Sequence, residues 1–153
     1  MDLILWRHAE AFPIEEGQND SDRVLTPRGE RQADRMAQWL ERQLPESAKI
    51  FCSPARRTEQ TVLPLGRKYK LRDELSQQAT VEHALELAQW PNSKHSLLFV
   101  THQPLIGHLV SHLLGISDTE MVIKKGSVWW LRHRLKDDVA QTMLLTVQSP
   151  DLL

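Results

Sequence analysis

Cysteine is almost absent from this sequence, because Cys52 is the only one among its 153 residues. One cysteine excludes an internal disulfide framework and a zinc module built on several cysteines, and it favours a reducing compartment. Long apolar runs are missing as well, so no segment is predicted to span a membrane. The N-terminus lacks both the basic region and the long apolar stretch of a signal peptide. We therefore expect a soluble, cytoplasmic protein.

The sequence also lacks an excess of charge of either sign. Nineteen basic and twenty acidic residues give a formal net charge of −1, which argues against a general nucleic-acid binder. Low-complexity tracts, internal repeats and linkers are absent, and a composition of 41% hydrophobic and 25% charged residues is typical of globular proteins. We expect a single domain over residues 1–153 that is a monomer and binds neither membranes nor nucleic acids.

Short apolar runs alternate along the chain with segments of helical spacing. Five runs predict strands, at residues 3–6, 48–52, 97–101, 128–135 and 142–147. Four segments predict helices, at residues 27–44, 54–63, 80–90 and 104–114. The alternation predicts an α/β fold, a three-layer sandwich with a mostly parallel central sheet flanked by helices. The last two strands, joined by residues 136–141, are expected to form an antiparallel hairpin near the C-terminus.

Two of these helices are predicted to begin at a capping side chain followed by proline. Thr26-Pro27 and Ser53-Pro54 have this pattern, in which the hydroxyl caps the helix and the proline occupies its first turn. Thr26 and Ser53 are therefore both expected to be N-caps. Residues 9–25 are polar and acidic with little periodicity, so they predict a loop.

Three predicted strands end in polar residues that could act together. Arg7 and His8 follow the first strand, Arg57 lies just beyond the second, and His102 follows the most clearly buried one. Because ligands bind at the carboxyl ends of parallel strands, these side chains should share one crevice. Two guanidiniums and two imidazoles favour an anion, most naturally phosphate. Taken singly, each residue is more typical of a solvated surface or of a capping or core histidine.

Four motifs resemble those of the histidine phosphatase superfamily, the phosphoglycerate mutase-like proteins, and they occur in that family's order. They are LWRHAEA at residues 5–11, LTPRGERQA at 25–33, SPARRTEQT at 53–61 and VTHQPLIG at 100–107. The short chain and the Arg-His-x-x-Ala start are most similar to the SixA-type phosphohistidine phosphatases. The sequence departs from the family pattern at Ala9, where glycine is common, and alanine fits only if that backbone avoids positive φ.

The resemblance implies a role for each matching residue. His8 would be the nucleophile that receives the phosphoryl group, while Arg7, Arg57 and His102 would hold its oxygens. Arg23 would be a further substrate-binding residue, and no cofactor or metal is implied. Nearby arginines disfavour the imidazolium form, so the pKa of His8 should be lowered and its ring should be nucleophilic at neutral pH.

The substrate class depends on whether a general acid is present. Many phosphomonoesterases of this superfamily have a glutamate where Gln77 falls in this sequence, and Glu74 is the nearest carboxyl group. An alkoxide leaving group needs a proton, because a hydroxyl has a pKa of about 15.7, whereas the imidazole released from a phosphohistidine has a conjugate acid with a pKa of about 6.5. Gln77 therefore favours phosphohistidine on a partner protein as the substrate. A pocket without a long lid insertion favours it too.

Two alternatives remain open from the sequence. One is a small-molecule phosphomonoesterase of the same superfamily, in which Glu74 supplies the proton. The other is a phosphate-binding module without turnover. A cysteine phosphatase built on Cys52 is disfavoured, because the glycine-rich phosphate loop that it would need is missing. His108 and His112, four residues apart, predict a solvated helix face rather than a metal site.

Overall fold

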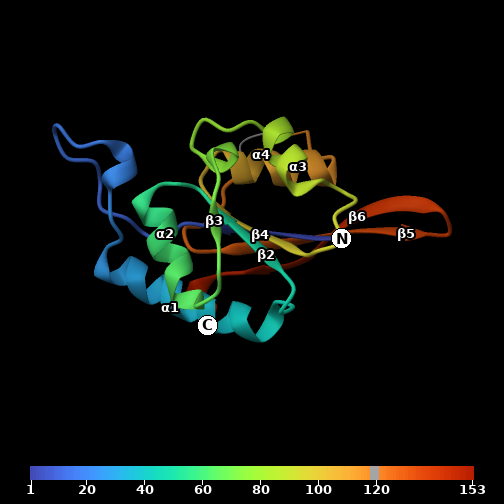
Figure 1. The fold of residues 1–153 in the computed structure, drawn as a ribbon, viewed down its shortest axis with the longest axis horizontal. Helices are drawn as coiled ribbons and strands as arrows, with labels where there is room; N and C mark the ends of the chain where they lie inside the picture. Colours follow the sequence, from blue (N-terminus) through green and yellow to red (C-terminus); the bar gives the residue numbers. More distant parts are fainter. Residues whose placement is uncertain (118–120) are drawn as a thin grey trace.

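The fold is built around a central β-sheet (Figure 1). The computed structural model describes residues 1–117 and 121–153, and the strands in these ranges form a sheet with the order β3-β2-β4-β1-β5-β6. The strands are β1 (Asp2–Arg7), β2 (Lys49–Cys52), β3 (Lys70–Leu71), β4 (Leu97–Thr101), β5 (Val128–Lys136) and β6 (Val139–Gln148). Strands β1 to β4 are parallel, whereas β5 is antiparallel to β1 and β6 to β5.

Helices cover both faces of the sheet (Figure 1). They are α1 (Pro27–Gln43), α2 (Arg56–Val62), α3 (Val81–Ala88) and α4 (Leu105–Leu114), with short 3-10 turns η1 (Asp20–Asp22), η2 (Leu63–Leu65), η3 (Asp73–Leu75) and η4 (Pro150–Leu152). Alternate residues of β1 face opposite layers: Trp6 packs with α1 and α2, whereas Leu5 packs with α3 and α4. The predicted three-layer α/β sandwich is confirmed. In the described residues, no helix has the length and apolar character that crossing a membrane requires.

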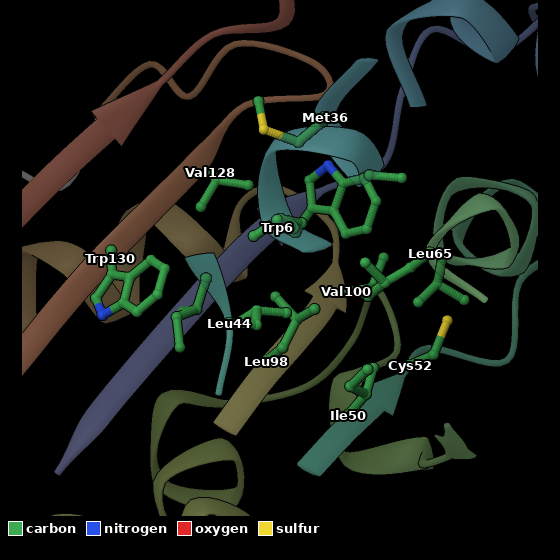
Figure 2. Packing of buried hydrophobic residues seen from close by; sticks show 14 residues of the cluster. Trp6, Met36, Leu44, Ile50, Cys52, Leu65, Leu98, Val100, Val128 and Trp130 are labelled. Atoms are coloured by element: carbon green, nitrogen blue, oxygen red, sulfur yellow. The ribbon is translucent and has the colours of Figure 1, made fainter. Parts of the chain in front are cut away.

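Trp6 occupies the middle of the core layer beneath α1 (Figure 2). It is fully buried and packs in one cluster with Met36 of α1, Val100 of β4 and Val128 of β5. Its indole N–H donates a hydrogen bond of 3.1 Å to the carbonyl oxygen of Gly126. The end of β1 is therefore fixed by both packing and a buried hydrogen bond.

Helix α2 begins later than predicted. Ser53 is not its N-cap, because α2 starts at Arg56 after Ala55, which makes no side-chain cap. The hydroxyl of Ser53 instead bonds His102, 49 positions away, a contact that no local pattern reveals. The prediction for Ser53 is therefore wrong. Thr26 does cap α1 as predicted, and its side chain accepts the N–H of Gly29 at 3.0 Å.

The C-terminal hairpin is antiparallel, as predicted, but its link is shorter. Only Asp137 and Asp138 connect β5 and β6, so the prediction of a link over residues 136–141 is wrong. Both aspartates have positive φ, at 52° and 64°, as the favoured two-residue hairpin turns require. The outer halves of the two strands are exposed, so they lack the alternation that marks a half-buried strand.

Candidate active site

The ends of β1, β2 and β4 meet at one edge of the sheet. The parallel register places Arg7 of β1 beside Thr101 of β4, so the residues that follow these strands lie close together. The N–H of His8 donates to the carbonyl oxygen of Thr101 at 3.1 Å. The rings of His8 and His102 lie 5.4 Å apart between centroids. The structure thus brings together the two histidines that the sequence analysis selected.

His8 is 6% exposed and is held in one tautomer. Its Nδ1 lies 2.8 Å from the carbonyl oxygen of Ala9, and because a carbonyl only accepts, Nδ1 carries the proton and Nε2 keeps its lone pair. Burial lowers the pKa of His8 to about 3, against the opposing effect of the Ala9 hydrogen bond. Three positive charges lower it further, those of Arg57, Arg7 and Arg23. The ring is therefore neutral at pH 7.

His102 is held between a serine and an arginine. Its Nδ1 lies 3.2 Å from Nη2 of Arg57, and because a guanidinium only donates, Nδ1 accepts. Its Nε2–H then donates to Oγ of Ser53 at 2.7 Å. Burial lowers the pKa of His102 to about 3, and the charge of Arg57 contributes in the same direction. This ring is also neutral at pH 7.

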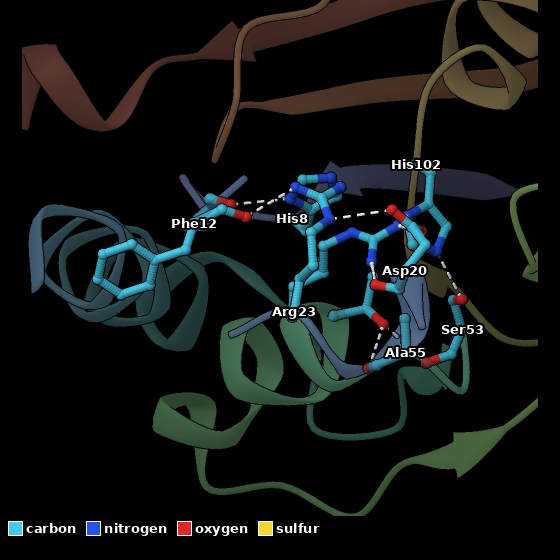
Figure 3. A network of polar contacts seen from close by, with 10 residues as sticks. His8, Phe12, Asp20, Arg23, Ser53, Ala55 and His102 are labelled. Carbon is cyan, nitrogen blue, oxygen red and sulfur yellow. Dashed lines mark hydrogen bonds and ion pairs between the residues drawn. The ribbon is translucent and has the colours of Figure 1, made fainter. Parts of the chain in front are cut away.

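The carboxylate of Asp20 lies where two guanidiniums converge (Figure 3). Nη2 of Arg57 donates to its Oδ2 at 2.8 Å, and Nε of Arg23 donates to its Oδ1 at 2.9 Å. Nη1 of Arg57 donates to the backbone carbonyl of Asp20 at 2.8 Å. Burial acts to raise the pKa of Asp20, but the two arginines outweigh it and hold that pKa below its usual value. The two guanidiniums are thus arranged to bind an oxyanion.

Asp20 was not predicted from the sequence to be a site residue. It lies in η1, inside the stretch 9–25 that was predicted only as a loop. The available signal was its position three residues before Arg23, a spacing at which an acid and a base can pair within one turn. Its other partner, Arg57, is 37 residues away and could not be found from local spacing.

Of the remaining predicted residues, Arg23 lies in the site and Arg7 points elsewhere. Nη1 of Arg23 donates to the carbonyl oxygen of Phe12 at 3.0 Å (Figure 3). Nη1 of Arg7 donates to the carbonyl oxygen of Ile123 at 2.6 Å, and Arg7 lines a neighbouring hollow of about 470 Å³. Arg7 therefore acts on His8 through its charge, while its guanidinium faces a different part of the surface.

Asp20, Arg57 and His102, but not His8 or Arg23, line a cavity of about 330 Å³, which we call the site cavity. Its walls come from η1, the chain after β2 and the chain after η3. The lining residues are Asn19, Asp20, Ser21, Ser53, Pro54, Ala55, Arg57, Ser76, Gln77, Gln78 and His102. Gln77 is part of the wall, whereas Glu74 is exposed and lies outside it. Of the residues that the structure describes, Asp20 alone contributes a carboxyl group to the lining.

Thr61, in the third motif, fixes the backbone on which two site residues depend. Its Oγ1 accepts the N–H of Ala9 at 3.0 Å and donates to the carbonyl oxygen of Arg57 at 2.7 Å. These bonds hold the residue after His8 against the helix that carries Arg57. No role for Thr61 was predicted from the sequence, because its partner Ala9 is 52 positions away.

The loop after His8 rests directly on the first turn of α1. A Cβ at Gly29 would lie 1.9 Å from the carbonyl oxygen of Glu10, so only glycine permits this approach. Ala9 is not among the described residues with positive φ. Alanine therefore fits at the position where the family commonly has glycine.

Two other candidate chemistries find no support in the structure. Cys52 is buried, which raises the pKa of its thiol to about 12 and leaves no thiolate for nucleophilic attack. His108 and His112 are exposed on α4. Within residues 1–117 and 121–153, no three histidine, cysteine, aspartate or glutamate side chains gather as a metal site.

Comparisons with known proteins agree with this geometry. The family model "Histidine phosphatase superfamily (branch 1)" matches residues 3–80. The solved structure of the protein histidine phosphatase SixA complexed with tungstate is 26% identical, with a TM-score of 0.82 and coverage of 99% of both chains. Fold and site together define a phosphatase, and the chain belongs to the histidine phosphatase superfamily.

The similarity is also clear in sequence. The chain is 31% identical over 127 residues to the phosphohistidine phosphatase SixA of Escherichia coli (strain K12). The matched region covers 74% of each protein. It is 33% identical over 120 residues to an uncharacterized protein of Mycobacterium tuberculosis (strain ATCC 25618 / H37Rv), covering 76% of this chain and 75% of that protein. Within the superfamily, the chain is of the SixA type.

Proposed function

We propose that this phosphatase hydrolyses phosphohistidine on a partner protein, through a phosphoryl group carried covalently by His8. The observation that carries the proposal is the neutral ring of His8, whose Nε2 keeps its lone pair beside the guanidiniums of the site. The name of the Escherichia coli relative supports the same substrate.

In the first step, Nε2 of His8 attacks phosphorus and the P–N bond of the substrate breaks. The substrate ring leaves as neutral imidazole when its other nitrogen carries a proton. The new bond makes the ring of His8 cationic, and the Nδ1–H that points at the carbonyl oxygen of Ala9 stabilises this charge. No proton has to leave His8 in this step.

Water completes the reaction in the second step. Its oxygen bonds to phosphorus while the bond to Nε2 of His8 breaks, and its proton passes to the phosphate. The guanidiniums of Arg57 and Arg23 neutralise the phosphoryl oxygens once these take the place of the Asp20 carboxylate. Among the described residues, the Nε–H of Arg57 is buried without a hydrogen-bond partner, and Arg7 contributes through its charge.

The lack of a usable acid favours phosphohistidine over phosphate esters. Gln77 cannot supply a proton, Glu74 lies outside the site cavity, and Asp20 enters the reaction ionised, because Arg57 and Arg23 hold its pKa below its usual value before the anion binds. The conjugate acid of an imidazole leaving group has a pKa of about 6.5, whereas that of an alkoxide leaving group has a pKa of about 15.7. Only the alkoxide therefore has to be protonated as it leaves. The P–N bond is therefore the one that this site can break without a proton donor.

A phosphotransfer experiment tests the proposal. The chain is incubated with a radiolabelled phosphohistidine peptide and denatured after short times, and we expect acid-labile label on the protein together with released phosphate. His8→Ala should abolish both. His108→Ala, which changes an exposed histidine of α4, should retain both. Label on the His8→Ala chain, or a higher kcat/KM for a matched phosphoserine peptide, would overturn the proposal.

A further inference from the structure

A second cavity, which the proposed reaction does not use, opens at the edge of the sheet. Strand β3 pairs with β2 only at Lys70 and Leu71. Before these residues the chain diverges from β2 (Figure 1). The cavity between the two segments has a volume of about 660 Å³. Its lining residues, which we call the basic wedge, are Ala48, Lys49, Ile50, Phe51, Arg67, Lys68, Tyr69, Lys70 and Arg72.

Positive charge is concentrated in the basic wedge. Five of its nine residues are basic, in a chain whose net charge is −1. Among the described residues, Arg67 is the only one of these five in an ion pair, with Glu41 at 3.0 Å. Lys70 lies in β3 and the backbone of Arg72 is extended, so these two side chains point to the same side of the sheet, and Lys68 is exposed two residues before Lys70. The wedge therefore presents a row of cations to an acidic partner.

The shape of the basic wedge suits an extended peptide. The guanidinium of Arg72 lies 5.4 Å from the ring centroid of Phe51, which gives the wedge an apolar floor. Lys49 and Ile50 pair with β4 on one side but have no partner residue in β3 on the other. A peptide can add to such an open strand edge while its side chains meet alternate positions beside it. Cations at alternate positions match acidic residues at alternate positions.

The basic wedge and the site cavity are neighbours on the same two segments. Phe51 lines the wedge and Ser53 lines the site cavity, two residues further on, which is about 7 Å along an extended chain. Arg72 lines the wedge and Ser76 lines the site cavity. The N–H of Arg72 donates to the carbonyl oxygen of Cys52 at 2.9 Å, which joins the two segments there.

We propose that the basic wedge docks an acidic, extended segment of the phosphoprotein partner and so presents the adjoining phosphohistidine to His8. The identity of the partner as a phosphoprotein rests on the proposed function. Acidic residues near the phosphohistidine then determine which partner is used. Lys68, Lys70 and Arg72 are the residues that bind them.

The test uses two phosphohistidine peptides that differ only in their flank. One flank has aspartate and glutamate at alternate positions, and the other has asparagine and glutamine there. We expect the chain to prefer the acidic peptide by about tenfold in kcat/KM, mainly through KM, and to lose this preference at high salt. The double variant Lys68→Gln/Lys70→Gln should lose the preference and keep its rate on the neutral peptide. Lys94→Gln/Lys136→Gln, at two exposed lysines outside the wedge, should behave like the unchanged chain.

Binding of the unphosphorylated acidic peptide, followed by fluorescence polarisation, separates this inference from the proposed function. If no peptide is hydrolysed but the acidic peptide binds the chain and not the Lys68→Gln/Lys70→Gln variant, docking stands and the proposed reaction fails. If both peptides are hydrolysed equally, or the variant keeps the acidic preference, the docking proposal fails while the phosphatase reaction stands.

Discussion

At the scale of single residues, Asp20 uses the same donors that a phosphoryl group would need. Its carboxylate takes the hydrogen bonds of Arg57 and Arg23, so an anion binds there only after the carboxylate has moved. Asp20→Asn removes the charge and keeps the shape of the side chain. We expect this variant to bind tungstate about tenfold more tightly, which corresponds to about 1.4 kcal/mol. Isothermal titration calorimetry measures the change.

The matched control for this variant is Asp22→Asn. Asp22 lies in the same turn, and among the described residues it forms no ion pair. Its substitution should leave the dissociation constant of tungstate unchanged. Weaker binding by Asp20→Asn would show instead that the carboxylate is needed to orient the arginines.

The lowered pKa values of the two site histidines predict a loss of stability in acid. His8 and His102 have pKa values of about 3 in the folded chain, and an unfolded histidine has a pKa of about 6.5. Between these limits the unfolded chain binds more protons. Each histidine therefore lowers the free energy of unfolding by up to about 1.4 kcal/mol per pH unit as the pH falls from about 6.5 towards 3.

Urea unfolding between pH 4 and pH 7 measures this dependence. His8→Asn should reduce its slope by about one proton, because one of the two contributions is removed. His112→Asn, at an exposed position of α4, serves as the comparison. An identical slope in His8→Asn and the unchanged chain would contradict the assignment of a buried neutral ring to His8.

At the scale of elements, the contact between α1 and the loop after His8 predicts the effect of one substitution. Gly29→Ala would place a Cβ 1.9 Å from the carbonyl oxygen of Glu10. We expect a loss of about 1–3 kcal/mol of stability, although glycine to alanine inside an unobstructed helix gains about 0.5–1 kcal/mol. Phosphatase activity should fall as well, because the displaced loop follows directly on His8.

Thermal unfolding and turnover of a phosphohistidine peptide measure both effects. Gln38→Ala, at an exposed position of the same helix, should change neither. A Gly29→Ala chain more stable than the parent would show that the loop moves away at no cost.

Most strands and helices could be predicted because their burial follows a local period. Residues 97–101, which form β4, are all buried. Thr26 caps α1 by accepting the N–H of Gly29, only three residues further on. Strand β3 spans two residues, which is too short to have a period. Ser53 failed as a helix cap because the fold brings His102 next to its hydroxyl. Local pattern and tertiary contact compete at such positions, and the tertiary contact prevails.

The site could be predicted only in part for a related reason. His8, Arg57 and His102 end or follow elements whose order puts them at one edge of the sheet, so their proximity followed from the fold class. Asp20 lies in a loop, and the conformation of a loop is set by the partners that it meets. The guanidinium of Arg7 is directed by its hydrogen bond to the carbonyl oxygen of Ile123, which is 116 positions away in the sequence.

At the scale of the whole molecule, ligand binding should stabilise the fold as a unit, because the site joins η1, α2 and the ends of three strands. An anion present at 100 times its Kd adds about 2.7 kcal/mol. For a chain of this size, that corresponds to an increase in Tm of roughly 5 to 10 °C. Scanning calorimetry with and without tungstate measures the increase.

Arg57→Ala should abolish the increase in Tm. Arg57 is fully buried and donates to the carboxylate of Asp20, which lies where the anion is expected to bind. Arg56→Ala changes the exposed neighbour in the same helix and should retain the increase. An equal increase in both variants would place the tungstate elsewhere on the surface.

The strand order has a consequence for the nascent chain. Strand β4 pairs between β1 and β2, although it follows both in the sequence. During translation the facing edges of β1 and β2 therefore stay unpaired until residues 97–101 have left the ribosome, a period in which unpaired edges invite aggregation. His8 is synthesised before Thr101, 93 positions later, and acquires this partner only then. The site would thus form only after β4 has been synthesised and has paired between β1 and β2.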